Sequence, residues 1–235
     1  MMVHKFRNAL EIKEHIMIKL YGIGFSSPVN KVRYCLNHLG LTYDWEQTNP
    51  MQGENQKAEY VEAFPTGKIP AIDVDGFKLV ESNAIIRYLA TINNSTIYPT
   101  DAKKRALVDV WLDYSSIHVG AAMGRVLYNR LFAPMNNLPV DEASLKTGLE
   151  FLAKYFPIIE KQLTKNFYLA GKELTIADIC LLATLDPCEL AKINLGQFPH
   201  IIKWRNGLKT QEFYQKCYKD YTQFAQDAFA AKAGK

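Results

Sequence analysis

The stretch FPTGKIPAIDVDGFKLVESNAIIRYL, residues 64–89, constrains the fold of this chain more than any other. Residues 69–74 have the two-residue alternation of a strand, and an Asp-Gly pair separates them from a second short run. Asp-Gly between two such runs predicts a β-hairpin. Next, Ser82 is placed to cap a helix whose apolar side chains recur at i, i+3, i+4 and i+7 from Ile85. The stretch thus predicts a strand, a hairpin, a second strand and a helix.

Two features of this stretch suit the binding of a small peptide. Pro70 lacks the N–H that a strand donates, which is tolerated at an edge, at a bulge or next to a cis peptide bond. A cis bond at Ile69–Pro70 would turn the Ile69 backbone toward a ligand that pairs as an added strand, whereas an ordinary trans proline would only start the strand. The helix start offers free N–H groups to a carboxylate. The alternative makes Ser82 a plain cap and Glu81 a solvated charge.

The segment before this stretch has the pattern of a strand, a loop, a helix and a strand. Apolar residues alternate from Ile16 to a strand end at Tyr21. Pro28 suits the first position of a helix that Gly40 closes. Residues 42–46 have strand character, which completes a βαβ unit.

The polar, turn-forming residues 93–100 separate this half from one in which the patterns are helical. Apolar residues recur at helical spacing over residues 107–121 and 145–163. In GKELTIADI, Thr175 and Asp178 have the spacing of a capping box at the start of a helix that is apolar nearly all round. That helix is therefore expected to be central and buried.

We expect an α+β protein of two domains, βαβ-ββα followed by an all-helical bundle. The expected boundaries are an N-terminal extension at residues 1–15, a first domain at 16–92, a linker at 93–103 and a helical domain at 104–235. The extension lacks the apolar core of a signal peptide, and no apolar run has membrane-spanning length. These features predict a cytoplasmic protein without a membrane partner.

Charge and cysteine spacing argue against two further classes of function. The formal net charge is only +4 and the basic residues are scattered, which argues against nucleic-acid binding. The 4 cysteines have neither CxxC nor zinc-ligand spacing, so we expect no metal site and buried, reduced thiols.

The run GKIPAI, followed by DG and ESNAIIRYL, resembles the glutathione-site half of the thioredoxin-like domain in the cytosolic glutathione S-transferase superfamily. The resemblance covers about residues 16–225 and implies that glutathione is the co-substrate, with no other cofactor. It further implies that the Ile69 backbone, held by a cis Pro70, pairs with the cysteinyl part of glutathione. Glu81 and Ser82 are implied to bind the γ-glutamyl end. Two residues are implied at the glycyl end: Lys68, and Asn55 in the place of a histidine of many relatives.

Such an enzyme must ionise a thiol whose free pKa is about 8.5. Lowering that pKa by about two units takes roughly 2.7 kcal/mol, which a hydroxyl hydrogen bond and a helix N-terminus could supply. The loop before Pro28 offers Ser26 and Ser27. Ser27 is expected to cap the helix, which would leave Ser26 freer, and Tyr21 is an alternative. The SSP run resembles the serine-type classes, theta-like and bacterial, in which either serine could hold the catalytic role.

The resemblance also implies a hydrophobic electrophile bound between the domains, for which Tyr114 and His118 are the candidate contacts, and a homodimer. His118 lies at helical spacing on an apolar face, which favours packing or pocket lining over metal ligation. One rival function is a non-catalytic interaction module, because the FPTGKIPA…ESNAI run is also similar to elongation factor 1 gamma. Glutathione-dependent dehalogenation, isomerisation or peroxide reduction are further alternatives on the same site.

Overall fold

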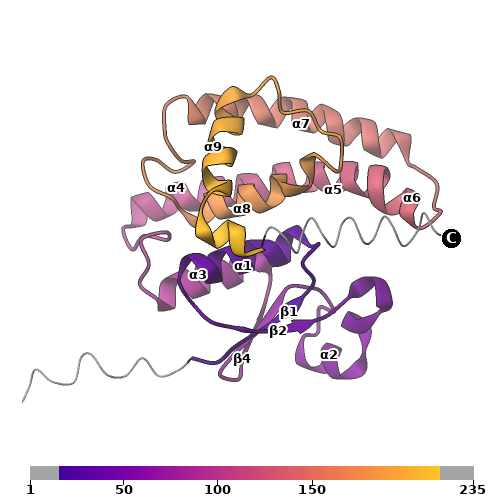
Figure 1. Ribbon diagram of the computed structural model, residues 1–235, viewed down its shortest axis with the longest axis vertical. Helices are drawn as coiled ribbons and strands as arrows, with labels where there is room; N and C mark the ends of the chain where they lie inside the picture. The colour runs from indigo at the N-terminus through magenta and orange to yellow at the C-terminus, as the bar shows by residue number, and fades with distance from the viewer. Residues whose placement is uncertain (1–15, 218–235) are drawn as a thin grey trace, which may run out of the picture.

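The computed structural model describes residues 16–217 of the chain, so the proposed extension at residues 1–15 and the end of the helical domain lie outside the described residues. Two layers are visible in Figure 1: a sheet with its helices, shown in indigo and purple, and a helical layer in pink to yellow. Helices α1 (Ser27–His38) and α3 (Ser82–Ile92) lie between the sheet and the helical layer. The α+β architecture predicted from sequence is confirmed.

Four strands form one mixed sheet in the order β2-β1-β3-β4. They are β1 (Ile18–Gly22), β2 (Asp44–Gln47), β3 (Ala71–Val74) and β4 (Phe77–Val80). Strand β1 pairs in parallel with β2 and antiparallel with β3, and β3 pairs antiparallel with β4. Asp75 (φ 51°) and Gly76 (φ 86°) turn the β3–β4 hairpin in the left-handed region that the Asp-Gly pair predicted.

The two faces of the sheet are covered differently. Buried apolar side chains of α1 and α3 pack on one face and continue into the helical domain as a single hydrophobic cluster. Tyr60 of the short helix α2 (Ala58–Ala63) and Phe64, directly after it, form a separate cluster with Ala71. Two 3₁₀ turns, Pro50–Gln52 and Glu54–Gln56, precede α2. The sheet therefore presents α1 and α3 to the helical domain.

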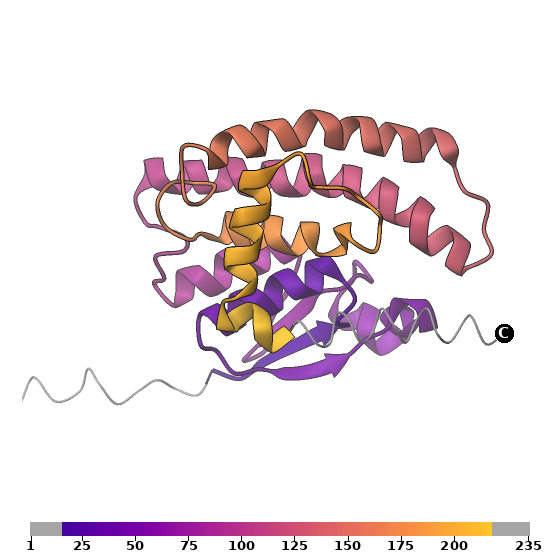
Figure 2. The same cartoon turned by 45° about the horizontal axis from the view of Figure 1, so that its top comes forward.

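The helical half begins with one long run of helix that changes its hydrogen-bonding pattern twice. Helix α4 (Ala102–Asp113) continues through a π-helical segment (Tyr114–Gly120) into α5 (Ala121–Leu127). A second π-helical segment (Tyr128–Phe132) leads into α6 (Ala133–Met135). Helix α7 (Glu142–Leu163) runs alongside this helix (Figure 2) and contacts α5 closely.

Helix α8 (Ile176–Leu185) is the centre of the helical domain and packs against α1 and α4. The predicted capping box is present: the Asp178 carboxylate accepts from the Thr175 backbone N–H at 3.0 Å. It also accepts from the backbone N–H of Leu169 at 2.9 Å and from the indole of Trp204 at 3.1 Å. The 3₁₀ turn Asp186–Cys188 and helix α9 (Pro199–Lys209) follow.

Two helix starts differ by one residue from the sequence-based expectation. Helix α1 begins at Ser27, so Ser26 is the N-cap and Pro28 takes the second helical position. Helix α3 begins at Ser82, so Glu81, and not Ser82, occupies the N-cap. Each expectation placed the boundary one residue late. Within residues 16–217, no helix combines the length and apolar character needed to cross a bilayer.

Candidate active site

A cavity of about 570 Å³ lies where the sheet domain meets the helical domain. The loop after β1, the start of α1, Ile69 and the start of α3 line it from one domain. The π-helical segment before α5, α5 itself and the end of α8 line it from the other. Residues that are far apart in the sequence therefore line the same cavity.

Ser26 and Ser27 both line this cavity. Ser26 has an extended backbone at the N-cap (φ −91°, ψ 114°), and its side chain makes no capping hydrogen bond to the described residues. Buried Asn30 fixes the loop before α1, because its amide nitrogen donates to the Gly24 carbonyl at 2.7 Å. The Ser26 hydroxyl is thus at the helix N-terminus and is not committed to capping it.

Tyr21, the alternative candidate, points away from this hollow. Its ring packs edge-on against Phe64 at 5.0 Å and against Tyr60 at 6.0 Å, on the α2 side of the sheet. The alternation along β1 explains this position, because successive side chains of a strand point to opposite faces. The structure therefore favours the serines over Tyr21.

The Ile69–Pro70 peptide bond is cis. Ile69 lines the cavity, and Pro70 is buried beside it. The turn before them is held by two side chains: the Tyr60 hydroxyl donates to the Lys68 carbonyl at 2.7 Å, and the Asn55 amide donates to the Gly67 carbonyl at 2.6 Å.

Asn55 and Lys68 were the candidates for the glycyl end of glutathione. Asn55 is buried, and its amide nitrogen is committed to the Gly67 turn, so the structure gives it a bracing role. Its Oδ1 atom is buried with no hydrogen-bond partner in the described part of the chain. Lys68 has an exposed side chain, and like Asn55 it lies outside the residues that line the cavity.

At the start of α3, Glu81 has a backbone conformation (φ 67°, ψ 106°) that non-glycine residues rarely adopt. Such strain persists only where the surrounding structure requires it, and it is concentrated at ligand sites. Ser82 follows as the first helical residue and lines the cavity. Its hydroxyl accepts a hydrogen bond from the ammonium of Lys31, at 3.1 Å.

Lys31 is a cavity residue that sequence reasoning missed. It lies on α1, is only 6% exposed, and its ammonium also donates to Asn83 Oδ1 at 2.7 Å. The signal available in the sequence was its position between Val29 and Val32, two members of the apolar face of α1. A lysine so close to a buried face needs a polar partner.

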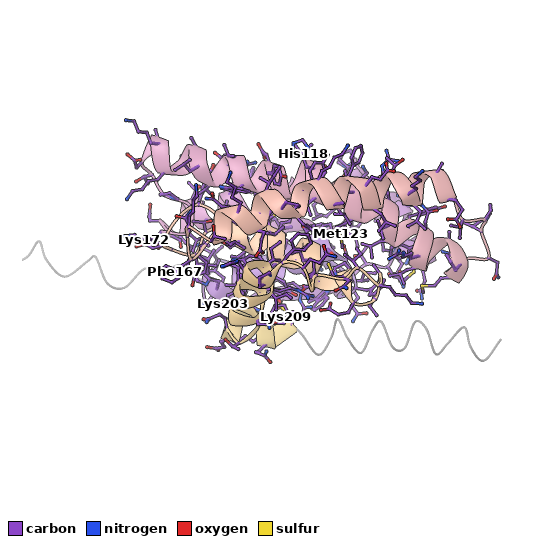
Figure 3. The ribbon with its side chains drawn as sticks, turned by 90° about the horizontal axis from the view of Figure 1, so that it is seen from above. His118, Met123, Phe167, Lys172, Lys203 and Lys209 are labelled. Atoms are coloured by element: carbon purple, nitrogen blue, oxygen red, sulfur yellow. The ribbon has the colours of Figure 1, made fainter. Side chains whose placement is uncertain are left out.

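Tyr114 and His118, the residues expected to contact the electrophile, are not among the residues that line the cavity. Their rings lie 5.2 Å apart, and both pack against Tyr155 of α7. His118 lies at the outer edge of its helix, whereas Met123, on the same continuous helix, is buried and lines the cavity (Figure 3). The two side chains therefore share one face of the helix, as their spacing predicted, but that face meets α7 and not the cavity.

The helical wall of the cavity is mostly apolar. Its side chains include those of Met123, Leu127 and Phe132. The Phe132 ring packs edge-on against Phe25 of the loop after β1, at 5.9 Å. Ser116 adds one hydroxyl next to the start of α3, where it accepts from the Asn83 amide at 2.8 Å. The cavity thus has a polar half at α1 and α3 and an apolar half at α5.

A four-stranded mixed sheet with a cis proline beside a cavity, followed by a helical bundle, is the architecture of a glutathione-binding transferase. Two family models match the chain: "Glutathione S-transferase, N-terminal domain" over residues 17–91 and "Glutathione S-transferase, C-terminal domain" over residues 122–212. The chain therefore belongs to the glutathione S-transferase family.

Individual relatives agree with this assignment. Glutathione S-transferase 1 of Zea mays is 30% identical over 207 residues, which span 85% of this chain and 94% of the relative. Glutathione S-transferase F10 of Arabidopsis thaliana is 33% identical over 171 residues, covering 71% and 79% of the two chains.

Solved structures give the same result. Glutathione transferase F2 of Populus trichocarpa has a TM-score of 0.82 at 26% identity, covering 88% of this chain and 99% of that one. Glutathione S-transferase-I bound with lactoylglutathione has a TM-score of 0.79 at 28% identity, covering 85% and 97%.

The superfamily expected from sequence is confirmed, but the finer placement among theta-like, bacterial serine-type forms is wrong. The curated relatives and structures reported above include plant proteins of the F series. The SSP run and the GKIPAI…ESNAI motif identified the superfamily, but they did not separate one class of it from another.

Proposed function

We propose that this protein is a glutathione transferase of the plant F (phi) type, which ionises the glutathione thiol and adds it to a hydrophobic electrophile. One observation carries the proposal: a single cavity brings together Ser26, Ser27, Ile69 and Ser82 from three separate segments. The named relatives support catalysis over the interaction-module rival. Dehalogenation, isomerisation and peroxide reduction remain chemistries that the same site could host, and no contact in the cavity favours them.

Glutathione is proposed to lie as an extended peptide along the polar half of the cavity. Its cysteinyl backbone pairs with Ile69, next to the cis Pro70, and its γ-glutamyl end meets Glu81 and Ser82. The strained Glu81 backbone and the free N–H groups at the start of α3 support this placement. Exposed Lys68 is proposed to attract the glycyl carboxylate, while Asn55 acts indirectly by holding the Gly67 turn.

Ser26 is proposed as the residue that stabilises the thiolate, with Ser27 as the alternative. The Ser26 hydroxyl lines the cavity without a capping bond, so it can donate to a sulfur. The α1 N-terminus adds a positive dipole end. Together these two effects can supply the roughly 2.7 kcal/mol that a pKa shift of about two units requires.

The electrophile is proposed to bind against the apolar half of the cavity. The side chains there take the role first expected of Tyr114 and His118. Phe25, Met123, Leu127 and Phe132 offer aliphatic and aromatic surface there. Burial of apolar substrate surface against these side chains would supply most of the binding free energy, at about 25 cal/mol per Å².

Self-association is proposed through the outer face formed by β4, α3 and α4. Several large apolar side chains are exposed on these elements: Phe77 (51%), Ile92 (37%), Leu107 (53%) and Val110 (59%). Exposed apolar groups gathered on one side of a protein favour a protein partner. This supports the homodimer that the family resemblance implied.

The test of the catalytic proposal is a pH titration of protein-bound glutathione that follows the ultraviolet absorbance of the thiolate. In the wild type the bound thiol should ionise well below its free pKa of about 8.5. That shift should be lost in Ser26→Ala and kept in Ser27→Ala, which serves as the matched control. Loss of the shift in Ser27→Ala alone would transfer the role to Ser27, and an unshifted wild-type thiol would refute thiol activation.

A further inference from the structure

Lys31 places a positive charge inside the cavity with only neutral partners around it. The residue is 6% exposed, and its ammonium donates to Ser82 Oγ and Asn83 Oδ1. Among residues 16–217, no carboxylate forms an ion pair with it. A buried charge of this kind is costly unless an opposite charge offsets it.

The ammonium and the Ser82 hydroxyl each retain one donor for a ligand. An ammonium has three N–H donors, and two of the three are used by Ser82 and Asn83. Ser82 Oγ accepts from Lys31, so the proton of its own hydroxyl remains free for another acceptor. Since both groups line the cavity, one anionic ligand group beside Ser82 could accept from both.

Asn83 and Ser116 fix the position of the Lys31 ammonium. The Asn83 amide nitrogen donates to Ser116 Oγ at 2.8 Å, so its oxygen is the atom that faces Lys31 at 2.7 Å. Ser116 Oγ lies 3.2 Å from the sulfur of buried Cys180. This chain of hydrogen bonds joins α1, α3, the π-helical segment and α8, so the charge is held from several elements at once.

We propose that the Lys31 ammonium is the counter-ion of the α-carboxylate on the γ-glutamyl residue of glutathione. The inference rests on the proposed function, which places the γ-glutamyl end at Ser82. A carboxylate that accepts from the Ser82 hydroxyl and from the N–H groups at the start of α3 comes within reach of an ammonium 3.1 Å from Ser82 Oγ. Lys31 therefore acts on the affinity for glutathione, and the serine loop acts on the thiol.

A cycle of two ligands and two proteins tests this pairing by calorimetry. The ligands are glutathione and γ-aminobutyryl-cysteinyl-glycine, which lacks only the α-carboxylate. In Lys31→Met, the Kd for glutathione should rise roughly 10- to 100-fold, the range for a charge-assisted bond, while the Kd for the analogue changes little. Lys31→Arg should retain most of the affinity for glutathione. An equal rise in the Kd of both ligands, or no rise in the Kd of either, would overturn the pairing.

Three controls make the result specific to Lys31. Lys19→Met removes one positive charge from an exposed pair with Glu46 and should leave both affinities unchanged. Lys31→Gln repeats the test if Lys31→Met does not fold, because its amide can still donate to Ser82 and Asn83. The thiol pKa of bound glutathione should be the same in Lys31→Met and Lys31→Gln as in the wild type. A raised thiol pKa with an unaltered Kd would assign Lys31 to the thiolate and refute the carboxylate pairing.

The failure of this inference differs from that of the proposed function. A wild-type protein that does not bind glutathione refutes the proposed function. A wild type that binds glutathione and a Lys31→Met variant that binds it equally well refute only the role of Lys31.

Discussion

The hydroxyl of Tyr34, on α1 of the sheet domain, lies 2.5 Å from a carboxylate oxygen of Asp186, the residue directly after α8 of the helical domain. Tyr214 donates to the other carboxylate oxygen at 3.1 Å. Asp186 precedes Pro187, which lines the cavity, so this buried contact joins the two domains next to the site. Burial raises the pKa of the Tyr34 phenol well above its ordinary value, so Tyr34 remains the donor.

The Tyr34→Phe variant should destabilise the protein by about 2 kcal/mol, because the buried Asp186 carboxylate loses one of its two phenol donors. Urea denaturation followed by circular dichroism measures the change. Tyr128→Phe removes an exposed hydroxyl and should cost less than about 0.5 kcal/mol. Equal stability of the two variants would show that the Tyr34–Asp186 bond contributes nothing.

The contribution of Asp186 to stability should fall as the pH rises from about 4 to about 6. Burial raises the pKa of its carboxyl to about 6 in the folded protein, against about 3.9 when unfolded. The folded state therefore binds the proton more tightly, and ionisation above pH 4 disfavours folding by a total of roughly 3 kcal/mol. The free energy of unfolding of the wild type relative to Asp186→Asn, measured at each pH, should decline over this window. If this difference in the free energy of unfolding stayed constant or rose with pH, the raised pKa of Asp186 would be contradicted.

Asp178→Ala should be far more destabilising than the loss of an ordinary helix cap. Its buried carboxylate accepts from the backbone of Leu169 and Thr175 and from the side chain of Trp204, so its removal leaves several buried donors unpaired. A loss of about 3 kcal/mol or more is expected. The matched control is Asp141→Ala, which removes a single exposed capping bond to Ser144 and should cost about 1 kcal/mol. Similar losses in thermal or urea denaturation would reduce Asp178 to a simple cap.

Leu127→Ala should raise the KM for a hydrophobic electrophile several-fold and leave the Kd for glutathione unchanged, because Leu127 lines the apolar half of the cavity. His118→Ala is the matched control on the same long helix and should alter neither constant, because His118 packs against Tyr114 and Tyr155. Steady-state kinetics with a model aryl halide measures the KM, and calorimetry measures the Kd for glutathione. An effect of His118→Ala on the electrophile KM alone would restore the original expectation.

The sequence determined the features that depend on neighbours along the chain. The Asp-Gly hairpin, the capping box at Thr175 and Asp178, and the strand, loop and helix before Gly40 all follow from local turn chemistry and short-range periodicity. These motifs were specific enough to give the fold and the superfamily.

The tertiary structure alone decided which side chains share the cavity. Lys31 became a site residue because α1 packs so that its ammonium meets Ser82, 51 positions away in the sequence. Periodicity showed that Tyr114 and His118 lie on one face of a helix, but not that this face meets α7 instead of the cavity. The reason is that spacing along one helix defines its faces, whereas the element that each face contacts depends on packing between distant segments.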